Sequence, residues 1–374
     1  MKKKKTLRKI FLTLGLVVAT PIVLFLILAV LVYIPPVQRF IVREATSVLS
    51  DATGMRVHIG RVRLAFPLDL ALGDMQAIRG RDTLVDARAL RVGVRLWPLV
   101  HGRAEVNIVS LIDARLNTLD LIPDVQVSGR VGLLSAALPG GVDLGEERVL
   151  VDRVMLKNTA LLVALSDTAR EDTTPAAPSR WDIHLRRADI VNTSLALRMP
   201  GDSMRVGARL GRATIRHGRF DTGRSHYAVG LLALDRSAAT YDVPQAMRLA
   251  SGIDPNHIAV ERLTLRVDSI DYDSAGRLNL NLRRLAFDER SGLSVAQLYG
   301  RVRLDTASIA LPALTLRTAH SRLTAHVVLD WAALTAGRGG ELKALVDARL
   351  GRGDVLILAG EALPADLRPL IPDE

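Results

Sequence analysis

The sequence predicts a mostly β protein that follows a single N-terminal transmembrane helix. Two observations lead to this prediction: a long uncharged apolar run near the N-terminus, and an alternation of apolar and polar residues over most of the remainder. The composition agrees, because 49% of the 374 residues are hydrophobic, which is too many for a disordered chain. The chain has no cysteine, which excludes disulfide scaffolds, zinc ribbons, iron–sulfur clusters and thiol catalysis.

Residues 1–9 form a basic cytoplasmic tail that contains six lysines and arginines and no acidic residue. The tail supplies more than half of the net charge of +11 and leaves +5 for the rest of the chain. The remaining arginines are scattered among apolar residues, and only 4% of the residues are aromatic. Nucleic-acid surfaces usually combine a basic cluster with aromatic side chains for stacking. We therefore expect no nucleic-acid partner.

Residues 10–34 are predicted to form a transmembrane anchor. The run from Ile10 to Ile34 carries no charge, and as a helix it would span about 37 Å, which exceeds a hydrocarbon core of about 30 Å. The basic flank should stay in the cytoplasm. We therefore expect a single-pass protein of the inner (plasma) membrane, with a cytoplasmic N-terminus and its bulk in the periplasm. The alternative is a cleaved signal peptide, although its usual apolar core of about 7–15 residues is shorter.

Residues 37–54 are predicted to contain a short amphipathic helix after Pro35-Pro36. Apolar residues recur at spacings of three and four between Val37 and Leu49, and Gly54 is a plausible end signal. We expect this helix to cap the open end of the sheet that follows. The other placement is along the membrane surface.

Residues 55–374 are predicted to form an elongated β region in the periplasm. Further alternating stretches are Leu84–Val94, Ala104–Leu116, Val149–Leu165, Ser194–Met199, Val302–Leu311 and Leu323–Leu329. At three places the alternation slips by one residue: after Ile59, after Val267 and after Leu282. A slip turns the apolar residues to the opposite face, so each one predicts a bulge, kink or tight turn. Residues 166–180 are polar and predict an exposed loop, and Tyr241–Leu249 is the only later segment with helical character.

No catalytic or metal-binding pattern is present in the sequence. The eight histidines lack the HExxH and HxH spacings of metal sites, and there is no GxSxG, P-loop or GxGxxG motif at the start of a helix. Pairs of carboxylates such as Asp271 and Asp273 have no marked acid–base partner. We expect a protein that is not an enzyme and that needs no metal and no cofactor.

The order of elements resembles the TamB/AsmA-like family of envelope proteins. Three stretches carry the resemblance: Ile34–Phe66 (IPPVQRFIVREATSVLSDATGMRVHIGRVRLAF), Val125–Asp167 (VQVSGRVGLLSAALPGGVDLGEERVLVDRVMLKNTALLVALSD) and Gly252–Asp271 (GIDPNHIAVERLTLRVDSID). Together they cover about a quarter of the chain. The resemblance implies an elongated antiparallel β-sheet, curled into a groove like a taco or solenoid. It also implies phospholipid transport between the inner and outer membranes and a possible outer-membrane barrel partner. Family members are several times longer, so we expect this chain to be a fragment, a split gene product or a short paralogue.

The physical case for a lipid groove stands beside the resemblance. Moving a diacyl lipid through water exposes about thirty methylenes at about 0.8 kcal/mol each, roughly 24 kcal/mol, and an apolar trough removes most of that cost. Candidate groove residues are Val57, Ile59, Val62, Leu64, Phe66, Leu263, Leu265, Val267, Leu278, Leu280 and Leu282. Alternation is equally compatible with a sandwich or solenoid whose apolar face closes on itself. The alternative function is a non-transport scaffold for outer-membrane protein assembly or secretion.

Overall fold

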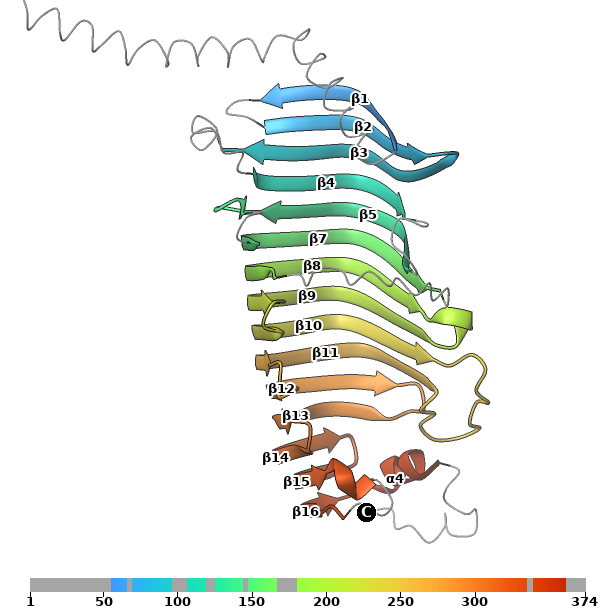
Figure 1. Cartoon of the computed structure of the whole chain (residues 1–374). Coiled ribbons are helices and arrows are strands. Elements are labelled where there is room, and N and C mark those ends of the chain that lie inside the picture. The colour runs from blue at the N-terminus through green and yellow to red at the C-terminus, as the bar shows by residue number, and fades with distance from the viewer. Residues whose placement is uncertain are drawn as a thin grey trace, which may run out of the picture.

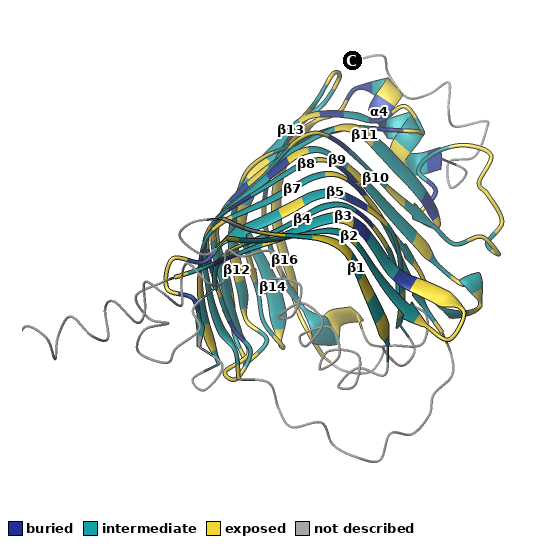
Figure 2. Cartoon of the chain, turned by 90° about the horizontal axis from the view of Figure 1, so that it is seen from above, coloured by how far each residue is buried: buried dark blue, intermediate teal, exposed yellow. Residues whose placement is uncertain are grey.

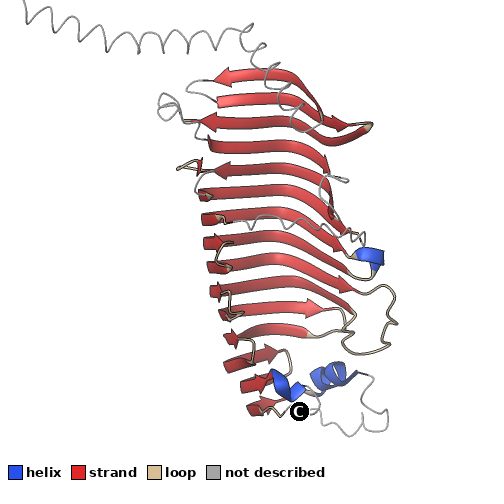
Figure 3. Ribbon diagram, in the orientation of Figure 1, coloured by secondary structure: helices blue, strands red, loops and turns tan. Residues whose placement is uncertain are grey.

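A computed structural model describes residues 55–65, 69–95, 106–118, 125–143, 147–166, 180–334 and 339–360. The described chain is dominated by strands, as Figures 1 and 3 show. The strands are β1 (Arg56–Ala65), β2 (Asp69–Arg79), β3 (Asp82–Val94), β4 (Val106–Asn117), β5 (Val125–Ala137), β6 (Val142–Asp143), β7 (Arg148–Leu165), β8 (Asp182–Arg198), β9 (Arg205–Asp221), β10 (His226–Asp242), β11 (His257–Tyr272), β12 (Leu278–Glu289), β13 (Ser294–Leu304), β14 (Ser308–Thr318), β15 (Arg322–Asp330) and β16 (Leu342–Arg349). Three short helices accompany them: η2 (Pro200–Asp202), η3 (Trp331–Leu334) and α4 (Arg352–Ala359).

All the strands belong to one long open sheet. They follow one another in chain order from β1 to β16, and only the short β6 lies off this path, beside β7. The first and last strands do not pair with each other, so the sheet is not closed. Seen from above in Figure 2, the sheet is strongly curled into a trough. At about 4.8 Å between neighbouring strands, fifteen strands make the trough roughly 70 Å long.

The prediction of a purely antiparallel sheet is wrong at one position. β7 and β8 run parallel, with Arg148 opposite Asp182, whereas every other neighbouring pair is antiparallel. A tight turn can only join antiparallel strands. Here the connection comprises the residues between Leu165 and Asp182, which is long enough to bring the chain back to the end at which β7 began.

The strands bend along two lines that cross the sheet, and we call these lines creases. The first crease passes through residues on neighbouring strands that face one another: Gly60, Asp74, Arg88, Asp113, Gly132, Asn158, Asn192, Gly211 and Arg236. Five of them have a left-handed backbone, with φ between 48° and 52°. The second crease runs through Asp152, Arg186, His217, Gly230 and Ser269 of the longest strands, and His217 and Ser269 again have positive φ.

The three predicted phase slips are confirmed as irregularities of the sheet. The first lies at Gly60, opposite the left-handed Asp74. The second coincides with Ser269, whose φ is 56°. The third is a shift of register between Leu282 and Leu285 where β12 pairs with β13. A residue in the left-handed region places two successive side chains on one face, which is how the alternation changes phase.

One segment with predicted helical character is not helical. Tyr241 and Asp242 end β10, and the chain then turns, with the amide of Ala246 donating to the carbonyl of Val243. His257 Nε2 lies 3.0 Å from the carbonyl oxygen of Ala246 and ties the turn to β11. This contact comes from a residue eleven positions later and favours the turn over the helix that the local pattern predicts.

Several predicted elements lie outside the described residues. These are the basic tail, the transmembrane segment and the amphipathic helix of residues 37–54, together with most of the loop of residues 166–180. Within the part of the chain that the structure describes, no helix is both long enough and apolar enough to cross a membrane. The described chain also turns at Leu138–Gly141 and just before β11 at Asp254–His257.

A candidate lipid-binding groove

The pairing of the strands shows which side chains share a face of the sheet. In an antiparallel pair, directly opposed residues point to the same side. Starting from Val57, one row runs through Ala77 and Val85 to Leu116, and a second row links Ile59 through Met75 to Ala87. The same tracing from β8 leads through Ile190, Ala213, Leu234 and Leu265. We call the face reached in this way the inner face.

The inner face lies inside the curl. Ala87 and Ala114 are fully buried beside Val131, and residues from both sides of the first crease, such as Leu111 and Leu116 of β4, pack against them. Side chains on the two sides of a bend converge only on its concave side. At each crease two successive residues point to the other face, as Arg186-Arg187 do in β8, because the convex side of a bend offers more room.

The inner face is almost free of charge. Among the described strand residues on it, the charged side chains lie at strand ends. They are Glu289 of β12, whose carboxylate accepts hydrogen bonds from the amides of Ala259 and Ser291, and the paired Arg79 and Asp82 beside the turn between β2 and β3. In the central strands β8 to β11 the inner residues are Ile183, Leu185, Ala188, Ile190, Thr193, Leu195, Leu197, Phe220, Gly218, Ile215, Ala213, Leu210, Ala208, Val206, Tyr227, Val229, Leu232, Leu234, Ser237, Ala239, Tyr241, Tyr272, Ile270, Val267, Leu265, Leu263, Val260 and Ile258.

The few polar residues deep in the trough satisfy their own hydrogen bonds. The hydroxyls of Thr159, Thr193 and Ser237 each donate to the backbone carbonyl two residues earlier, at 3.1–3.2 Å. Each of these residues directly follows a left-handed residue of the first crease. The hydroxyls therefore close the bend locally, and they do not interrupt the apolar lining with an unpaired polar group.

The trough is too wide to close on itself as a sandwich. In β8 the two creases, at Arg186 and Asn192, are six residues apart, and the same separation recurs in β7, β9 and β10. Six residues of strand span about 20 Å, whereas two sheets in contact lie about 10 Å apart. Apolar residues of the lining consequently stay accessible, as shown by Leu195, which is 39% exposed.

The sequence-predicted groove residues fall on this inner face wherever they are described. Val57, Ile59 and Val62 lie on it in β1, and the backbone of Leu64 pairs with that of Leu70. The three candidates of β11 and the three of β12 also lie on this face. Val267 directly opposes Leu282, whereas Leu265 opposes Leu285 and Leu278 opposes Tyr272. Phe66 lies outside the described residues. The candidates thus mark two separate parts of one lining, at its N-terminal end and past its middle.

The sequence patterns did not predict most of the strands that supply the middle of the lining. β9 and β10 were not predicted, and only the last part of β8 was. Glycine, alanine and threonine occupy many inward positions there, which weakens the apolar alternation. The outward residues could have identified β9 in the sequence, because five of them are arginines at strand-like spacings: Arg205, Arg209, Arg212, Arg216 and Arg219.

The outer face carries the charged side chains, many of which form ion pairs. Arg88 pairs with Asp113 along the first crease, and Arg186 Nη1 lies 2.9 Å from Asp152 Oδ1 along the second. Arg187 binds Asp189 with two nitrogens, at 2.6 and 2.8 Å. These hydrogen bonds hold the pKa of Asp189 below its usual value, against the opposing effect of burial. Most of the arginines are well exposed, so each pair adds little stability on its own.

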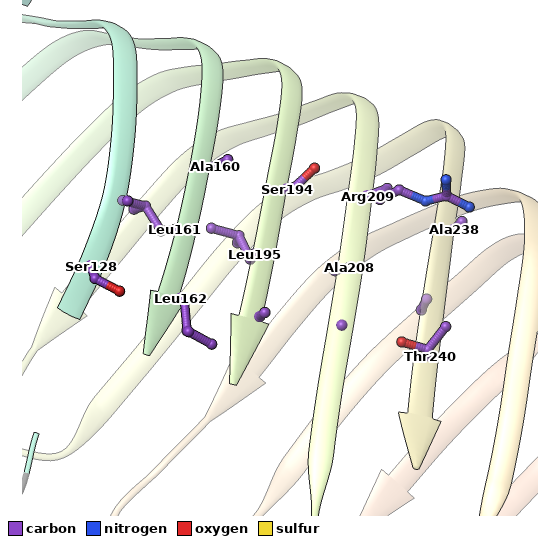
Figure 4. A pocket seen from close by; sticks show the side chains of 14 residues that line it. Ser128, Ala160, Leu161, Leu162, Ser194, Leu195, Ala208, Arg209, Ala238 and Thr240 are labelled. Atoms are coloured by element: carbon purple, nitrogen blue, oxygen red, sulfur yellow. The ribbon is translucent and has the colours of Figure 1, made fainter. Parts of the chain in front are cut away.

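The outer face also has a shallow hollow of about 520 Å³, shown in Figure 4. Small side chains form its floor, among them Ser128, Ala160, Ser194 and Ala238, and Arg209 stands at its edge. Pairing places these residues on the face opposite to the lining. Leu161, Leu195 and Ala208 of the inner face also border the hollow.

Neither metal coordination nor a known family identifies the site. The described residues contain no group of three or more His, Asp or Glu side chains placed to hold a metal ion. Comparison of the sequence with models of protein families and with curated proteins finds no match. The resemblance to the TamB/AsmA-like family stays a prediction, and the candidate site is defined by its geometry alone: an open trough with an uncharged apolar lining.

Proposed function

We propose that the protein carries phospholipids between the inner and outer membranes along its apolar trough, from a position anchored in the inner membrane. The observation that carries the proposal is the continuity of the uncharged lining over the whole sheet. A lipid that moves along this lining keeps its acyl chains on aliphatic side chains at every strand. In this way the protein contributes to the biogenesis of the outer membrane.

The dimensions of the trough support an acyl chain as the occupant. Side chains from two walls about 20 Å apart reach inward by about half the spacing of packed sheets each, which leaves a gap of about 10 Å. This gap admits one layer of hydrocarbon. The lining is aliphatic and has few hydrogen-bonding groups, which favours chains that slide over a ligand fixed in one orientation. The head group would stay in solvent at the open side.

Site-specific photocrosslinking tests the proposal. A photoreactive amino acid at Leu265 faces the trough, and the same probe at the neighbouring Arg266 faces outward on the same strand. We expect phospholipid adducts by mass spectrometry from the variant at 265 and few from the variant at 266. Equal yields from both positions, or no lipid from either, would reject a lipid-filled trough. The second outcome would leave the scaffold function as the better account.

A further inference from the structure

The last strand of the sheet has an open edge that differs from the rest of the molecule. β16 pairs with β15 through eight consecutive residue pairs without a shift of register. All eight of its residues are exposed, including Leu345 at 73%. No strand among the described residues pairs with its other edge. A regular edge strand with apolar side chains and no proline or bulge is a surface to which another strand can add.

The opposite edge of the sheet is not suited to the same use. The outward residues of β1 include Arg56, Arg61 and Arg63, with no acidic residue in the strand. Any second β1 laid antiparallel against it would bring arginines close to arginines, and like charges in directly opposed positions destabilise a strand pair. β1 is therefore protected against self-association, whereas β16 is not.

The outward residues of β16 and its entry form a charge pattern that complements itself. In order they are Glu341, Lys343, Leu345, Asp347 and Arg349, with signs minus, plus, neutral, minus, plus. Reversing the strand places each charge opposite its counterion. An antiparallel copy with Leu345 opposite Leu345 would pair Glu341 with Arg349 and Lys343 with Asp347, twice each. We propose that two copies of the chain associate through β16 in this register.

The same register also continues the apolar lining. It places Leu342 opposite Ala348 and Ala344 opposite Val346, and these four residues lie on the inner face, as their pairing with β15 shows. The two-fold axis passes through Leu345, so both copies use the same surface, as expected for a symmetric dimer. The two troughs then join into one at their C-terminal ends. This inference does not depend on what the trough carries.

Residues 361–374 are a poor alternative partner for this edge. Residues 361–374 contain Pro364, Pro369 and Pro372, and the longest stretch between two of them is four residues. Proline has no amide hydrogen to donate to a neighbouring strand, so this segment cannot complete a ladder along the eight residues of β16.

Disulfide trapping in the full chain tests the pairing, because the chain has no cysteine of its own. Directly opposed residues of antiparallel strands have Cα atoms about 4.5–5.5 Å apart, within the range of a disulfide. We expect Leu345→Cys, purified in detergent and oxidised, to form a covalent dimer on a non-reducing gel. Met247→Cys, which is 89% exposed in the loop after β10, is the matched control and should stay largely monomeric. Equal trapping of the two variants overturns the proposal.

Charge exchange then tests the register. In the Leu345→Cys background, the Lys343→Asp variant places an aspartate opposite Asp347 of the other copy. The Asp347→Lys variant places a lysine opposite Lys343 of the other copy. Each variant alone should dimerise at least tenfold more weakly, and an equal mixture should recover dimers that contain one chain of each. Lys343 is 75% exposed and its ammonium group lies 2.6 Å from the exposed carboxylate of Glu341, two residues earlier, so we expect its replacement to leave the sheet intact. If the single variants dimerise as strongly as the parent, the contact lies elsewhere and the proposal is overturned.

Discussion

Leu195 offers the sharpest measurement of how much the lining contributes to lipid binding. It lies on the inner face of β8, between Leu161 and Ala208, and is 39% exposed. Full burial of a leucine side chain stabilises by about 1.5–3 kcal/mol, so covering this fraction with an acyl chain contributes about 0.6–1.2 kcal/mol. Leu195→Ala should therefore weaken lipid binding about three- to eightfold.

A charge at the same position should act more strongly. Leu195→Asp places a carboxylate against hydrocarbon without a counterion, and we expect at least a tenfold loss of binding. The assay is transfer of a fluorescent phospholipid from vesicles to the full chain in detergent. Ser194→Asp is the matched control, because it adds the same charge one residue away on the outer face. Equal losses from the two aspartates, with unchanged melting temperatures, would refute the assignment of the inner face as the binding surface.

Two further predictions concern stability. Asn192 has φ of 49° and donates to Asn158 at 2.8 Å, so Asn192→Val should destabilise by about 2 kcal/mol in thermal unfolding while Asn192→Gly costs less; equal effects would argue against backbone strain at the crease. The pKa of Asp189 is lowered mainly by its hydrogen bonds from Arg187, so its ionised form is favoured by folding. This contribution is complete above the unfolded pKa of about 4 and is lost as the pH falls through the lower folded value. Urea unfolding between pH 2 and pH 6 should therefore show a weaker acid dependence for Asp189→Asn than for the parent chain, and an unchanged dependence would contradict the ion pair.

Local sequence rules predicted part of the lining and part of the bending. Side chains alternate between the two faces along a strand, so each residue can be assigned to a face without knowledge of the neighbouring strands. Val57 and Leu265 could therefore both be assigned to the apolar face. Asparagine tolerates the left-handed region, so Asn158 and Asn192 are compatible with a bend on local grounds. Arg236 and Arg262 have no such preference. Their backbone follows the crease set by the neighbouring strands.

The sequence by itself determined that the chain forms strands with one apolar and one charged face, because the alternation of side chains is a local property of the extended backbone. The tertiary structure decided how those faces are used. It aligned the bends of successive strands into two creases six residues apart, set β7 parallel to β8, and left β16 as an open edge with a self-complementary charge pattern. These features depend on register between strands that are distant in the chain, and register is set by pairing. The same alternation would otherwise be compatible with a closed sandwich.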